Sequence, residues 1–270
     1  MSYLDSLNST QKKNIDIIKD ESIKQGITNP YAIAGLLSII SKESSFIPRE
    51  ETSYKNTSNS RIRKIFSRVS GLSESELTSL KRDDLKFFNT VYGGRFGNSS
   101  NEGYKYRGRG FNQITFKDSY NKMGKKINEP IGENPEKLLE PKIAAKASVR
   151  FLKDRISSLK QNGKLSSYNA NDINDFKNEK DATMAFYHAN TGSGKSVNYV
   201  KSQENGSTLG GLNKALSRVK DLYNYIYQLV KTEKIKIFSK KTKSTYPTII
   251  ITSLLVISVY TIIVYIKKLK

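Results

Sequence analysis

The chain has 270 residues, of which 36% are hydrophobic and 26% charged, so it can form one sizeable globular domain with an appendage. The absence of cysteine excludes disulfides, thiolate metal sites and cysteine nucleophiles, and the single histidine, His188, disfavours a zinc site. The net charge is +21, and the lysines before residue 231 are scattered. We therefore expect attraction to anionic envelope polymers and no specific recognition of nucleic acid.

The first part of the chain predicts two helices. Residues 9–25 form the first, and Gly26 stops it. The second opens after the cap Asn29 with Pro30 at its first position, which is where proline is best tolerated. Its apolar face follows helical spacing and consists of Ile33, Leu36, Leu37 and Ile40.

The middle of the chain contrasts with these helices. The stretch Val91–Tyr120 is dense in glycine, and because glycine inside a helix costs roughly 1 kcal/mol relative to alanine, the stretch predicts loops and turns. Its aromatic, arginine and amide side chains suit a polar polymer such as a glycan or a nucleic acid, although a turn-rich structural segment has the same composition. Strands are scarce, so the body is predicted to be mainly α. Further helices are predicted over residues 59–69, 73–89, from Pro141 to near Gly163, 181–188 and 209–230.

Residues 231–270 differ in composition from the domain predicted over 1–230. They hold nine lysines and one glutamate, a net charge of +8. Residues 231–246 predict a basic linker or a continuation of the preceding helix. The span is predicted at 247–266, where the uncharged run 248–266 is nineteen residues long, close to the roughly 20 that span a bilayer; a buried core element is the alternative. We expect a single C-terminal transmembrane helix in a lipid bilayer, a short basic tail at 267–270, and no signal peptide.

Three carboxylates are candidates for acid–base chemistry. Glu43 follows Ile40 by three residues and so continues the apolar stripe of its helix, where desolvation favours the protonated form that a general acid needs. A frayed, solvated helix end is the alternative. Glu50 and Glu51 follow a break at Pro48, and a turn there can bring the chain back toward Glu43. Two carboxylates about 6.5–9.5 Å apart suit inverting glycoside hydrolysis.

The string ANTGSGKS, residues 189–196, partly matches a phosphate-binding loop. A true phosphate loop follows a buried strand and opens a long helix, and it begins with glycine where this chain has Ala189. The flanking residues do not fit that context. We expect a loop that closes one side of a cleft.

Five motifs follow one another along residues 28–220. They are SKESSF (41–46), EETSY (50–54), VYGGRFGN (91–98), GYKYRGRGFNQIT (103–115) and HANTGSG (188–194). In this order they resemble the acid-bearing segment, the base-bearing segment, the substrate-cleft block and the later Asn-Gly-Gly loop of glycoside hydrolase family 19. This chitinase-like family includes many phage and bacterial endolysins. The resemblance implies a mainly α, two-lobed, lysozyme/chitinase-like domain around a deep cleft.

The resemblance also implies roles for individual residues. Glu43 would be the general acid and Glu51 the base that activates water, with Glu50 as the rival base because the interval to Glu43 is shortened. The sugar subsites would be lined by Tyr106, Arg107, Arg109, Gln113, Thr115 and Asn190, and Arg109 could instead hold the acid or a loop in place.

The chain departs from the family pattern near these residues. Lys42 replaces the histidine before the acid, and neighbours on a helix usually point apart. The acid loop is one residue short. Phe116 stands where glycine is usual, and Ser119 where an asparagine often binds sugar.

Together these features predict a membrane-anchored glycosidase that cleaves β-1,4 bonds between amino sugars of peptidoglycan, or of a chitin-like polymer, without a cofactor. Hydrolysis with inversion is what the resemblance implies. A virus-encoded lysin in a virion membrane or the bacterial inner membrane fits an anchor without a signal peptide. A lytic transglycosylase that uses one glutamate stays open. The alternative from another class is a catalytically inactive, membrane-anchored glycan-binding or structural virion protein.

Overall fold

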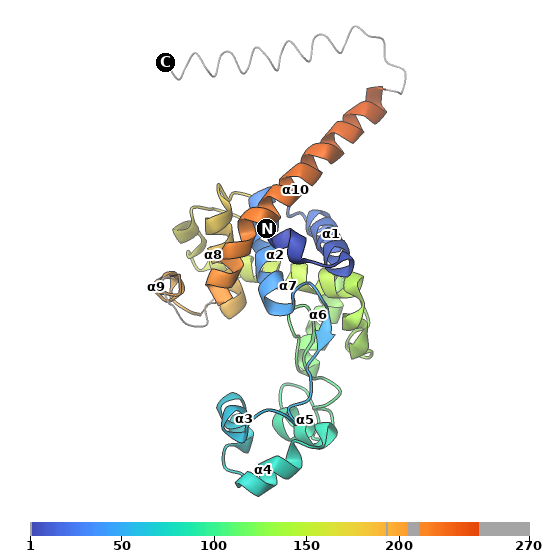
Figure 1. Ribbon diagram of the computed structural model, residues 1–270, viewed down its shortest axis with the longest axis vertical. Coiled ribbons are helices and arrows are strands. Elements are labelled where there is room, and N and C mark those ends of the chain that lie inside the picture. The colour runs from blue at the N-terminus through green and yellow to red at the C-terminus, as the bar shows by residue number, and fades with distance from the viewer. Residues whose placement is uncertain (1, 193, 205–210, 243–270) are drawn as a thin grey trace. The chain divides into compact units, whose positions relative to one another are not determined.

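The computed structural model describes residues 2–192, 194–204 and 211–242 (Figure 1). Contacts divide the chain into two compact units, Met1–Ile226 and Tyr227–Lys270, and the fold below is that of the first. It is mainly helical, as predicted. In chain order the elements are η1 (Tyr3–Ser6), α1 (Ser9–Lys24), α2 (Pro30–Ser44), β1 (Arg49–Glu50), α3 (Asn59–Ile65), η2 (Ser67–Val69), α4 (Glu74–Leu80), α5 (Asp84–Tyr92), β2 (Arg109–Gly110), α6 (Lys117–Ile127), η3 (Pro135–Leu139), α7 (Pro141–Gln161), η4 (Leu165–Tyr168), α8 (Glu179–Thr191), α9 (Val197–Ser202) and α10 (Gly211–Thr242).

The predicted fold class needs a correction at its membrane helix. Within the described residues, none of the helices is both long and apolar enough to cross a bilayer. Helix α2 is apolar, but its 15 residues extend only about 22 Å, less than the roughly 30 Å of a bilayer core. The longer helices α7 and α10 carry lysines along their length. The span predicted at 247–266 lies outside the described residues, so the fold class is corrected to a mainly α fold without it.

Local capping signals explain the helix starts that were predicted correctly. The Asn29 side chain accepts hydrogen bonds from the backbone N–H groups of Tyr31 and Ala32, and Pro30 is the first residue of α2. Helix α7 likewise opens at Pro141. Helix α1 is followed by Gly26, whose φ of 82° favours glycine.

Other segments differ from the prediction. The helix expected over 59–69 is divided into α3 and the 3-10 turn η2, and that over 73–89 into α4 and α5, with Asp83 capping the second. Helix α6 was not predicted, because it begins inside the glycine-rich stretch.

Helix α2 lies at the centre of the main helical body. Eleven of its fifteen residues are buried, and it packs along α8, while α1 packs against α7. A side chain at Gly35 would come within 2.9 Å of the Ala182 carbonyl carbon, so only glycine allows this close approach. Eight residues further on, Glu43 of α2 accepts a hydrogen bond from Asn190 of α8. The equal spacing from both contacts shows that the two helices run parallel.

The segment from α3 to α5 has a hydrophobic cluster of its own. Tyr54 packs edge-on against Phe66, and Phe66 against Phe87, with ring centroids 5.1 and 5.4 Å apart. Helices α3, α4 and α5 lie close together (Figure 1). The buried members of the cluster are Ile62, Phe66, Val69, Leu77, Phe87, Phe88 and Val91.

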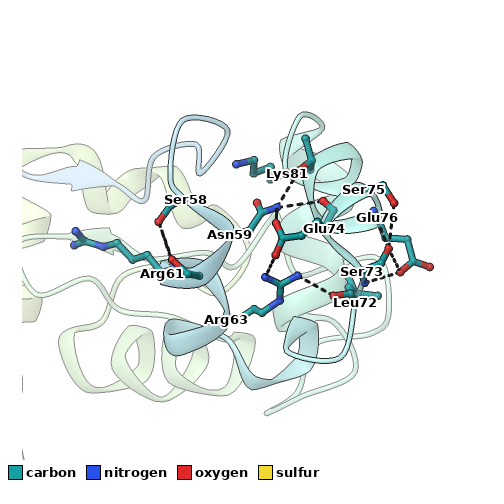
Figure 2. A network of polar contacts seen from close by, with 12 residues as sticks. Ser58, Asn59, Arg61, Arg63, Leu72, Ser73, Glu74, Ser75, Glu76 and Lys81 are labelled. Carbon is teal, nitrogen blue, oxygen red and sulfur yellow. Dashed lines mark hydrogen bonds and ion pairs between the residues drawn. The ribbon is translucent and has the colours of Figure 1, made fainter.

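A polar network fastens α3 to α4 (Figure 2). Asn59, at the start of α3, is 9% exposed, and its amide donates to the backbone carbonyl and carboxylate of Glu74 and to the Thr78 hydroxyl. Arg63 pairs with the same carboxylate and also donates to the Leu72 carbonyl. These hydrogen bonds lower the pKa of Glu74, that from Asn59 most strongly.

Candidate functional site

A two-stranded antiparallel ladder brings the second carboxylate motif against the glycine-rich block. Its register places Arg49 opposite Gly110 and Glu50 opposite Arg109. The Glu51 N–H continues the pairing by donating to the Gly108 carbonyl at 2.7 Å. The ladder therefore fixes the two motifs relative to each other, although they are more than fifty residues apart in sequence.

Glu43, one of the last residues of α2, is held through one carboxylate oxygen. Its Oε1 lies 2.6 Å from the Lys42 ammonium and accepts from the Asn190 amide at 2.7 Å. Asn190 in turn accepts from the Asn112 amide at 3.4 Å, which links α8 to the block. Within the described structure, Oε2 accepts no hydrogen bond, so it is the oxygen of Glu43 that is open to a ligand.

Lys42 differs from the expectation for neighbours on a helix. Its side chain bends back over the Tyr187 ring, with the ammonium 5.3 Å from the ring centroid, and so reaches Glu43. The Glu43 side chain remains 29% exposed, which leaves the carboxylate accessible to a ligand.

Glu51 has a different environment, made of neutral donors. Its Oε1 accepts from the Tyr54 and Tyr92 hydroxyls, each at 2.9 Å, and its Oε2 lies 3.2 Å from the Gly108 N–H. Burial raises the pKa of both tyrosines, and the Glu51 charge raises it further, so both remain donors over the physiological range. A side chain at Gly108 would contact the Gln113 Oε1 at 2.8 Å and the Glu51 Oε2 at 3.4 Å, so its glycine keeps the space between them open.

Glu50 is bound by arginine instead. Its Oε2 lies 2.6 Å from the Arg107 guanidinium and 3.5 Å from the Arg109 Nε, and both arginines are buried. A carboxylate that neutralises two buried guanidinium groups has a structural task. Geometry therefore favours Glu51 over Glu50 as a candidate base.

Three residues expected in the sugar subsites lie in the interior. Tyr106 donates to the Gly132 carbonyl, Arg107 to the Tyr104 carbonyl and Arg109 to the Lys105 carbonyl. Their exposed fractions are 2%, 6% and 6%. These side chains shape the block from inside, and Arg109 holds a loop and Glu50 without contacting Glu43.

The other expected subsite residues are partly exposed. Gln113, at a φ of 52°, donates to the Arg49 carbonyl at 2.9 Å, and Thr115 donates to the Gln113 carbonyl. Asn190 contacts Glu43 directly. The structure thus joins Glu43, Asn190 and Asn112 through hydrogen bonds, and it places Glu51 and Gln113 next to Gly108.

The departure at Phe116 has a backbone consequence. Phe116 has a φ of 71°, a left-handed conformation that a bulky residue rarely adopts and that glycine adopts without strain. Its ring packs against Phe96 and Tyr92, with centroids 4.8 and 5.2 Å away. Aromatic packing beside the Glu51 donor Tyr92 therefore offsets the strain. Ser119, the other departure, lines a neighbouring pocket.

His188 and the segment after it are organised around a helix end. Residues 189–191 belong to α8 and the six-residue α9 follows, so no strand precedes the segment as a phosphate loop requires. His188 is fully buried between the Tyr168 hydroxyl and the Lys195 carbonyl, both at 2.9 Å. Burial lowers its pKa, which fits a neutral ring that ties the segment to the core.

Comparisons with known proteins give no family assignment. No model of a known protein family matches the chain, and a search of curated proteins finds no match. The functional argument therefore rests on the motifs and on the geometry above.

Proposed function

We propose that this chain is a glycosidase that hydrolyses β-1,4 bonds between amino sugars of peptidoglycan. The observation that carries the proposal is the contrast between two carboxylates on separate elements. Glu43 has one oxygen occupied by donors and one free, whereas both oxygens of Glu51 accept from neutral groups. Two carboxyl groups in different environments are what an acid and a base require.

In the proposed reaction, Glu43 carries a proton on Oε2 and gives it to the glycosidic oxygen as the bond to the anomeric carbon breaks. Lys42 and Asn190 hold Oε1 and so orient the carboxyl group. Glu51 takes a proton from the water that attacks the opposite face of the sugar, which inverts the anomeric configuration. Tyr54 and Tyr92 fix the position of Glu51.

Peptidoglycan is the favoured substrate for two reasons. The motif order resembles that of endolysins, and the chain is strongly basic, which suits an anionic cell wall. A chitin-like polymer contains similar β-1,4-linked amino sugars without that charge, so it is the substrate for comparison.

A second candidate is a catalytically inactive glycan-binding protein. The observation that favours it is the Lys42 ammonium, 2.6 Å from Glu43. An ammonium this close makes Glu43 one half of an ion pair, so the carboxylate could serve only to hold Lys42 over the Tyr187 ring. Glycan binding would remain, because the block and Asn190 do not depend on proton transfer by Glu43.

The test is peptidoglycan cleavage by the full chain, followed as new reducing ends. We expect Glu43→Gln to lower the rate at least about 100-fold, and Glu51→Gln similarly, because acid–base groups contribute 10²–10⁴-fold. Exposed Glu133→Gln is the matched control and should match the parent. A parent that binds peptidoglycan but releases no ends supports the second candidate. Anhydro ends, lost with Glu43→Gln but not with Glu51→Gln, would indicate a lytic transglycosylase.

A further inference from the structure

An open pocket of about 460 Å³ lies beside the candidate site, between α6, α7 and the end of the glycine-rich block. Asn112, Gln113 and Thr115 form the wall that the pocket shares with the site. The Gln113 Oε1 and the Glu51 carboxylate both lie next to Gly108, so the wall of the pocket adjoins the Glu51 side of the site. A glycan held at Glu51 could therefore place a branch into this pocket.

The pocket combines an apolar floor with cations. Ile114, Met123 and Phe151 supply the apolar part. Lys122, Lys126 and Arg155 supply the cations, and Asp154 is the one acidic residue of the lining.

The acidic residue of the lining is already neutralised. Asp154 lies 2.5 Å from the Lys126 ammonium and 2.8 Å from the Arg150 Nε. In the described part of the chain, neither Lys122 nor Arg155 has a carboxylate within ion-pair distance, and the Arg155 guanidinium lies 5.2 Å from the centroid of the Phe151 ring. Two positive charges thus remain uncompensated above an apolar surface.

Building on the proposed function, we propose that this pocket binds an anionic group on a short branch of the glycan strand, with Lys122 and Arg155 as its partners. A neutral amino-sugar polymer has no anionic group that could pair with these two cations. A short peptide branch with methyl side groups and a free carboxylate matches both parts of the pocket, because the methyl groups pack on the floor and the carboxylate accepts from guanidinium and ammonium. The peptide-bearing sugars of peptidoglycan have such a branch.

Long-range charge is the competing explanation, since the whole chain is basic. The same two helices offer a matched control. Lys125 of α6 and Lys160 of α7 are exposed and lie outside the pocket lining. The variant Lys122→Gln/Arg155→Gln and the control Lys125→Gln/Lys160→Gln remove the same net charge from the same helices.

Binding is measured with the full chain carrying Glu43→Gln, so that the result does not depend on catalysis. The probes are a soluble disaccharide-peptide fragment of peptidoglycan, the same fragment with its carboxylates amidated, and a tetramer of N-acetylglucosamine. We expect the pocket variant to weaken binding of the free-carboxylate fragment about tenfold and to leave the other two unchanged. The control variant should match the parent.

Two further results decide the source of the anion and the fate of the proposal. Phosphate is tested by measuring binding to intact walls before and after extraction of their phosphate polymers. If the pocket variant binds intact walls more weakly than the parent but extracted walls equally well, the pocket binds phosphate, and the carboxylate branch is overturned. Equal weakening by the pocket and control variants, or no binding of the fragment by the parent, overturns the proposal altogether. Hydrolysis by the otherwise unaltered chain is scored separately, so a failed reaction and a failed pocket give different results.

Discussion

The contact between Gly35 of α2 and Ala182 of α8 gives the sharpest stability prediction, for Gly35→Ala. The new methyl group would lie 2.9 Å from the Ala182 carbonyl carbon, 3.0 Å from its Cβ and 3.0 Å from the Thr183 nitrogen. Two of these three atoms are backbone, so rotation of a side chain cannot relieve the overlap. The helices must separate by several tenths of an ångström.

Two opposing effects set the magnitude. Overpacking a core costs about 1–3 kcal/mol, and the rigidity of the obstructing atoms places this site in the upper half of that range. Against this cost, alanine stabilises a helix interior by roughly 1 kcal/mol relative to glycine. We therefore expect Gly35→Ala to lower the free energy of unfolding by about 1–2 kcal/mol, which corresponds to a Tm decrease of about 2–8 °C for a domain of this size.

Thermal unfolding of the full chain measures this, with Gly71→Ala as the control. Gly71 has an ordinary backbone conformation, and a methyl group added there would meet no atom within 4 Å, so its substitution should be neutral or raise the Tm slightly. If Gly35→Ala is as stable as Gly71→Ala, the reasoning about the α2–α8 contact is refuted. Under the proposed function, Gly35→Ala should also lower the cleavage rate, because the displaced helices carry Glu43 and Asn190.

Two other predictions concern the rest of the described structure. The pKa of Glu102 is lowered from 4.5 to about 2, most strongly by the hydrogen bond from the Ser99 backbone and next by that from Lys117. The ionised Glu102 therefore stabilises the fold fully above pH 4.5, and this stabilisation is lost as the pH falls toward 2. The difference in unfolding free energy between the parent and Glu102→Gln should therefore shrink over that interval in pH-dependent urea titrations, and a constant difference would contradict the assignment. Asn59→Ala should cost about 1–2 kcal/mol in the same titrations because it breaks three hydrogen bonds of a buried amide, whereas exposed Ser60→Ala should be nearly neutral.

The parts of the fold that were predictable depend on local chemistry. An asparagine cap followed by proline fixes the start of α2, and proline again opens α7, without help from distant residues. The division between α4 and α5 depends on Asp83, a cap in the middle of an otherwise helical pattern. Helix α6 was missed although Tyr120, Met123 and Ile127 follow helical spacing, because the surrounding lysines and the preceding glycines obscure it.

The candidate site was only partly predictable, because its geometry depends on long-range contacts. The motifs pointed to Glu43, Glu51 and Asn190, and the contact between Glu43 and Asn190 comes from the packing of α2 along α8. Tyr92 lies far from Glu51 in sequence and meets it only through tertiary packing. The pairing of Lys42 with Glu43 runs against the usual spacing rule, because the lysine stem bends over an aromatic ring contributed by α8.

The short ladder between β1 and β2 has a consequence for how this site can change. Side chains alternate along an extended chain, so Glu50 turns toward the buried arginines and Glu51 toward the tyrosines. The number of residues between α2 and β1 therefore decides which side chain faces the tyrosines and is available for chemistry. Gain of one residue there would move Glu50 to the place beside the tyrosines and would put Arg49 beside Arg107 and Arg109, which would then lack an anion. Loss of one residue would instead turn Glu51 toward the arginines and leave Thr52 beside the tyrosines. The ion pairs of Glu50 with Arg107 and Arg109 thus stabilise this one register of the ladder. The identity of the candidate base therefore depends on the same contacts that stabilise the fold.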